Sequence, residues 1–151
     1  MQTELQNVIV VPPGGGDAWN VLGTGMSCKI SSEQTGGVYS LVESHVPPQS
    51  GPPAHMHHNE DEVFYVVEGE FEIRCGDETF VAREGATAVL PKDVPHTFRN
   101  IGVGEGKLLT TIIPGGFERF FAEVSEKIQA MPQDTEKLLA IARKYNVEFV
   151  G

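Results

Sequence analysis

Short apolar runs separated by glycine and proline are the feature that most constrains what this chain can fold into. The 151 residues include 17 glycines and 10 prolines, spread along the chain. The runs rich in Val, Ile, Phe and Thr are 8–11, 18–22, 26–30, 38–46, 62–67, 71–75, 78–83, 86–90, 97–100 and 107–113. Many short strands between turn residues are typical of sandwiches and barrels. The sequence therefore predicts an all-β antiparallel body over residues 1–113.

The hydrophobic period changes after Pro114-Gly115-Gly116, which we interpret as a flexible hinge. The next apolar residues recur at helical spacing; they are Phe117, Phe120, Phe121, Val124, Ile128 and Met131. Pro132 should end this helix, and Asp134 suits the N-cap of a second helix that runs to about Tyr145. The expected buried side of the second helix is Leu138, Leu139, Ile141, Ala142 and Tyr145.

The segment 114–151 is too short to hold a core of its own, so we expect its helices to pack on the same domain. Two placements are open for the first helix. It could close the open end of the barrel over a pocket, or it could cover an outer face of a sheet.

Composition excludes several classes of function. The net charge is -10 and the pI is about 4.8, which argues against binding to nucleic acid or to anionic membrane surfaces. No apolar run is long enough to span a membrane, and the residues Met1 to Leu5 lack the pattern of a secretory signal. Cys28 and Cys75 lie far apart and without CxxC spacing, so we expect reduced thiols in a cytoplasmic protein.

Four side chains suited to binding a metal ion occur in two short segments. His55 and His57 are two residues apart, and on a strand such residues point to the same face. Glu62 begins the next run after a polar turn, and His96 follows a turn-rich stretch. Three imidazoles and one carboxylate are a full protein ligand set for a first-row transition metal. The sequence predicts one mononuclear metal site, with apolar neighbours from the same strand faces. Those expected pocket residues are Phe64, Val66 and Phe98.

The other polar residues nearby have plainer interpretations. We expect His45 to be solvated. His58 has the wrong parity to share the face of His57, so it should be exposed or lie behind the ligands. The acidic cluster of residues 60–62 could also be no more than a solvated turn.

The spacing of the two segments resembles the two motifs of the cupin superfamily. The first motif is matched by Gly51, His55, His57, Glu62 and Gly69. The second is matched by Gly85, Pro91, Asp93, His96 and Asn100, with Asp93 in place of a turn glycine. Asp tolerates left-handed turn conformations better than most residues do, so this departure is mild. The resemblance implies an antiparallel β-barrel or jelly roll of cupin type with the metal inside its wide end. It also implies pairing of two chains into a homodimer.

Within the superfamily, the chain is most similar to single-domain relatives of quercetin 2,3-dioxygenase. The residues that carry this similarity are 55–57, 65–70, 90–91, 95–98 and 114–118. The resemblance implies a metal-dependent dioxygenase that uses O2 and acts on a small planar substrate of flavonol-like or enolic type. The ion would be iron, manganese, nickel, cobalt or copper. Glu62 would then be a ligand and also the general base for the substrate hydroxyl.

Two other hypotheses share the same four ligands. In a cupin lyase or isomerase the ion acts only as a Lewis acid, and zinc would favour this chemistry because it has no redox activity. In a non-catalytic cupin the barrel only holds a small molecule. Oxygen consumption separates the first hypothesis from the other two.

Overall fold

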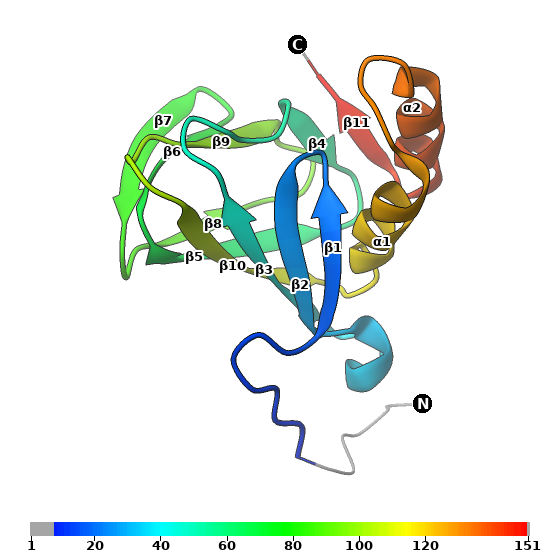
Figure 1. The fold of residues 1–151 in the computed structure, drawn as a ribbon, viewed down its shortest axis with the longest axis horizontal. Coiled ribbons are helices and arrows are strands. Elements are labelled where there is room, and N and C mark those ends of the chain that lie inside the picture. The colour runs from blue at the N-terminus through cyan, green and yellow to red at the C-terminus, as the bar shows by residue number, and fades with distance from the viewer. Residues whose placement is uncertain (1–7, 151) are drawn as a thin grey trace.

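Two antiparallel sheets face each other in the computed structural model, which describes residues 8–150 (Figure 1). The first sheet has six strands in the order β1-β2-β3-β10-β5-β8, and the second has five in the order β11-β4-β9-β6-β7. The strands are β1 (Asp17–Val21), β2 (Thr24–Ile30), β3 (Ser40–Val46), β4 (His55–His57), β5 (Asp61–Glu68), β6 (Glu70–Cys75), β7 (Glu78–Arg83), β8 (Thr87–Leu90), β9 (His96–Asn100), β10 (Gly106–Ile113) and β11 (Val147–Phe149). This arrangement confirms the predicted antiparallel β-barrel or jelly roll.

Period-two patterning explains why these segments form strands. In β3, β5 and β10 every second side chain is buried, and these side chains form the inner face of the first sheet. The hairpin of β6 and β7 closes with Cys75 opposite Glu78, so Gly76 and Asp77 are the two turn residues, as predicted.

The apolar core has two parts. One cluster lies between the two sheets and includes Phe71, Ile73 and Leu108. The other joins the inner face of the first sheet to the C-terminal helices and includes Val42, Ile112 and Phe120. Those helices are α1 (Glu118–Lys127) and α2 (Thr135–Lys144), and they lie beside β1 and β11 (Figure 1). No helix of the described residues is long and apolar enough to cross a membrane.

Several boundaries differ from the sequence prediction. Residues 8–11 form no strand, and Val8 and Val10 are exposed, because no other strand pairs with this run. A short 3-10 helix, η1 (Ser32–Thr35), interrupts the chain between β2 and β3. Helix α1 ends at Lys127, four residues before the exposed Met131. The residues 1–5 used to argue against a secretory signal lie outside the described range, as do the rest of residues 1–7 and Gly151.

The predicted N-cap at Asp134 and the predicted hinge at 114–116 both differ from expectation. Asp134 precedes α2, but its carboxylate accepts backbone N–H bonds from Gln129 and Ala130 instead of capping the helix. The segment 114–116, for which the sequence predicts a flexible hinge, is closely packed at Gly115. A Cβ atom on Gly115 would lie 2.7 Å from the Cβ of Ser32, so this segment is packed tightly against η1 and the loop after it.

Candidate metal centre

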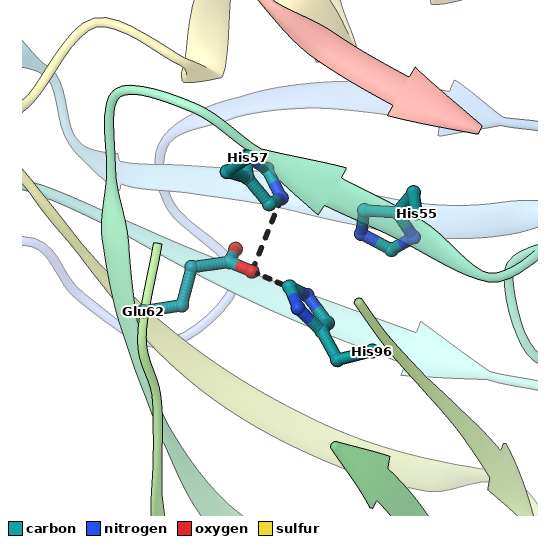
Figure 2. Close-up of side chains that lie close together, drawn as sticks. All are labelled: His55, His57, Glu62 and His96. Carbon is teal, nitrogen blue, oxygen red and sulfur yellow. Dashed lines mark ion pairs between the residues drawn. The ribbon is translucent and has the colours of Figure 1, made fainter. Parts of the chain in front are cut away.

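Strand β4 presents two imidazoles to one point. His55 and His57 project from the same side of the strand toward Glu62 and His96 (Figure 2). The strand is only three residues long. It is held on one side by β11, where Val147 pairs with His57, and on the other by β9, where His55 pairs with His96. A glycine is required four residues before the strand begins, because a Cβ on Gly51 would lie 1.8 Å from the carbonyl oxygen of Phe98.

Glu62 reaches the same point from the opposite sheet. Glu62 shares the inner face of β5 with Phe64 and Val66, as the strand parity predicts. The Oε1 atom of Glu62 lies 3.2 Å from Nε2 of His57 and 2.9 Å from Nε2 of His96. One possible ligand atom from each of His55, His57, Glu62 and His96 lies within 4.8 Å of the others. The structure thus brings together all four residues that the sequence singled out.

The loop before His96 is tied directly to the end of β4. Asp93 has a φ of 64°, in the left-handed region where the second motif usually has glycine. Its backbone N–H donates to the carbonyl of His57 over 2.8 Å. Its carboxylate lies 2.8 Å from Nδ1 of the exposed His58. Asp93 therefore adopts the left-handed conformation that the turn requires, and its side chain links the two motifs through His58. His58 itself points away from the site.

Hydrogen bonds fix which nitrogen of each ring faces inward. Nδ1 of His55 lies 2.8 Å from the carbonyl oxygen of Pro53, and Nδ1 of His96 lies 3.4 Å from that of Val94. Nδ1 of His57 lies 3.3 Å from Oε1 of Glu60. Because carbonyls and carboxylates only accept, each Nδ1 carries the proton when its ring is neutral, and each Nε2 lone pair is left for a ligand.

The innermost atoms of this cluster fit a bound cation. His57, Glu62 and His96 are 2%, 5% and 3% exposed. Although Glu62 Oε1 is close to both Nε2 atoms, none of the three atoms has a partner in hydrogen-bond geometry. Buried polar atoms are normally satisfied, so three unsatisfied atoms aimed at one point are the arrangement that a metal ion would complete.

The electrostatics of the cluster are strongly coupled. Burial and the neighbouring imidazoles of His96 and His57 lower the pKa of His55 to about 4. Burial also opposes a charge on His57, but attraction to the close carboxylate of Glu62 and the contact with Glu60 outweigh it and raise the pKa of His57 to about 9. Burial likewise disfavours ionisation of Glu62, yet His57 and His96 hold its pKa well below the usual range. The site thus keeps a carboxylate ready to bind a cation.

An apolar cavity of about 750 Å³ opens above the ligands. It is lined by His55, His57 and Glu62 at one end and by Phe117, Phe120 and Phe121 of the C-terminal segment. The Phe117 ring centroid is 4.3 Å from that of His57. Of the two placements left open by the sequence, the first helix adopts the one over the pocket. None of the described residues that line the cavity is Lys or Arg.

The predicted pocket residues have different outcomes. Phe64 and Phe98 line the cavity, and their ring centroids lie 5.5 Å apart. Val66 does not line it, because it lies two residues farther along β5 and is buried in the core between the sheets.

Two contributions to the site were missed by reasoning from the sequence. The sequence places Glu60 in a polar turn that could be solvated, but Glu60 is 7% exposed and contacts His57. Its position three residues after a ligand histidine, across a tight turn, is the only signal that could have indicated this. Strand β11 was also missed, although it supports β4 and places Phe149 on the cavity wall. His45 lies apart from the site and pairs with Glu43 and Glu105.

Sequence comparison with known proteins finds one family and several relatives that match part of this chain. Residues 42–112 match the family described as Cupin domain. An uncharacterized protein of Methanocaldococcus jannaschii is 33% identical over 75 residues, which are 50% of this chain and 60% of that protein. The polyketide synthase CurC of Streptomyces cyaneus is 30% identical over 82 residues, 54% of this chain and 53% of that protein. The chain thus spans little more than half the length of these curated relatives.

Solved structures share the fold at lower identity. A predicted oxalate decarboxylase from Thermotoga maritima has a TM-score of 0.64 and 21% identity, covering 70% of this chain and 99% of its own. An RmlC-like cupin from Shewanella frigidimarina has a TM-score of 0.64 and 19% identity, covering 77% and 99%. The domain match and the two sequence motifs assembled at one site support the cupin superfamily for residues 42–112, and the solved structures share the fold.

Proposed function

We propose that this cupin is a metal-dependent dioxygenase that binds one divalent transition-metal ion through His55, His57, Glu62 and His96. The observation that carries the proposal is the convergence of three unsatisfied buried donor atoms beside an apolar cavity, which His57 and Glu62 line. Nitrogen and carboxylate donors of this kind suit iron, manganese, nickel, cobalt or copper, and zinc as well. A redox-active ion held there would supply the one-electron chemistry that a reaction with O2 requires.

The chain's own residues would select and prepare the substrate. Phe64, Phe98 and the phenylalanines of the C-terminal segment offer flat apolar surfaces and exclude water from the ligands. Glu62 lines the cavity next to His57 and His96, and it is the carboxylate placed to accept the proton of a substrate hydroxyl. A substrate with an acidic enol or phenol on a planar ring satisfies both requirements.

The charge of the cavity supports the same substrate class. Without Lys or Arg among its described lining residues, the cavity offers no partner for a second negative charge on a ligand. The name of the relative from Streptomyces cyaneus, a polyketide synthase, is also consistent, since polyketide chemistry produces enolised and phenolic rings. We therefore favour an uncharged or singly acidic planar molecule over a small dicarboxylate.

Metal analysis followed by oxygen measurement tests the proposal. Protein purified without added metal is analysed for its elements, then loaded with the metal found and mixed with a flavonol or a cyclic β-diketone in an oxygen electrode cell. Oxygen uptake that depends on protein and is lost in His57→Ala supports a dioxygenase. Conversion of substrate without oxygen uptake points instead to a lyase or isomerase. Tight binding without conversion points to a non-catalytic cupin.

A further inference from the structure

One buried carboxylate next to the site lies outside the ligand set. Glu60 belongs to the turn between β4 and β5 and is 7% exposed. Its Oε1 atom lies 3.3 Å from Nδ1 of His57, while Nε2 of the same ring lies 3.2 Å from Glu62. The His57 ring is therefore placed between two carboxylates, with one nitrogen toward the ligand point and the other toward Glu60.

His57 differs in this respect from the other two histidines. The Nδ1 atoms of His55 and His96 face the backbone carbonyls of Pro53 and Val94, which orient the rings but carry no net charge. A carboxylate at the same position orients the ring and also makes its far nitrogen a stronger electron donor. Among the described residues, the Glu60 carboxylate hydrogen-bonds to Nδ1 of His57, so this carboxylate faces the ligand ring.

We propose that Glu60 is a positioning residue of the metal centre, which holds the His57 ring in its ligand orientation and strengthens Nε2 as a donor. This inference rests on the proposed metal site. It adds an outer acidic residue that occurs three positions after the second ligand histidine, within the polar turn that leads to Glu62.

Cobalt affinity provides a test that does not depend on activity. Co²⁺ is titrated into metal-free protein and followed by calorimetry and by its visible absorption, which responds to ligand geometry. Glu60→Gln keeps an oxygen acceptor of the same shape but removes the charge, and Glu60→Leu removes both. We expect Glu60→Leu to weaken binding about 10–100-fold and Glu60→Gln to weaken it by less, with a changed absorption spectrum in both. The matched control is Glu68→Gln, which removes the same charge from an exposed position at the end of β5.

The outcomes separate this inference from the proposed function. If the unmodified protein binds no Co²⁺, the proposed metal site itself is wrong and the inference falls with it. If it binds Co²⁺ and both Glu60 variants match it in affinity and spectrum, the metal site stands and the role of Glu60 is wrong. If Glu60→Leu does not fold, the isosteric Glu60→Gln decides alone. An equal loss in Glu68→Gln would show a general effect of charge and would also overturn the role of Glu60.

Discussion

Each of the three site imidazoles presents Nε2 to one point, so each should contribute directly to holding an ion. We predict that His57→Ala or His96→Ala removes most of the metal bound by the purified protein, because either change deletes one of four donors and one of the two imidazoles close to Glu62. Elemental analysis of the purified variants measures this. His45→Ala is the control, since His45 pairs with Glu43 and Glu105 away from the cavity. Unchanged metal content in either site variant would contradict the ligand assignment.

At the scale of residues, the sequence was informative where spacing reflects backbone geometry. The parity of His55 and His57 and the left-handed turn at Asp93 follow from rules for strands and turns. Glu60 could not be predicted in this way, because an acidic residue in a turn is exposed in most proteins. Its burial depends on how the turn folds over His57, which is a tertiary contact.

At the scale of elements, β11 is the part of the C-terminal segment that pairs with the ligand strand β4. It pairs residue for residue with β4, and Val150 donates a further backbone bond to Ala54. We predict that a chain ending at Asn146 binds metal more weakly, because β4 would become an edge strand paired to its sheet only through His55 and His96. Metal titration of the shortened and full chains checks this. Equal affinities would show that β9 alone holds the ligand strand.

The aromatic side chains of α1 should control what enters the cavity. Phe121 is half-buried and lines the cavity, so we predict that Phe121→Ala weakens binding of a flavonol while metal content stays the same. Its stability cost should be below the roughly 3–5 kcal/mol typical of a fully buried Phe. Flavonol titration and urea unfolding measure the two effects. Phe80→Ala, on the exposed edge strand β7, is the control. A variant that loses stability but binds the flavonol as before would contradict a role in the pocket.

Elements with a strong period were predictable, and short ones were not. The spacing of phenylalanines indicated α1, and alternation indicated most strands, because both patterns arise from one buried face. Strand β11 has only three residues and follows a helix directly, so it has no pattern of its own. The run 8–11 has the composition of a strand but pairs with no other strand of the described residues. Composition alone does not show whether a segment finds a strand to pair with.

At the scale of the whole molecule, the site depends on parts that are distant in the sequence. The ligands come from both sheets, and the C-terminal helices complete the cavity wall. The antiparallel class followed from the number and spacing of strands. The strand order and the placement of α1 over the pocket needed the structure, because they depend on which apolar faces pack together.

Stability should respond to pH differently in the metal-free and the metal-loaded protein. Without metal, the pKa of His57 is raised from 6.5 to about 9. A raised pKa in the folded state stabilises it fully below about pH 6.5, and this contribution is lost as pH rises through about 9. With metal, the ion replaces the proton on His57, and protons compete less as pH rises. Metal binding and the stability it adds should therefore increase over the same interval.

Urea unfolding between about pH 6 and pH 9.5, with a chelator or with excess Co²⁺, measures both slopes. We expect the metal-free protein to lose on the order of 1–3 kcal/mol across this interval and the gap between the two curves to widen. Glu62 does not oppose the trend, because its lowered pKa leaves it ionised throughout this range. Two curves that stay parallel would mean that the ion does not compete with the His57 proton, and would contradict ligation through this imidazole.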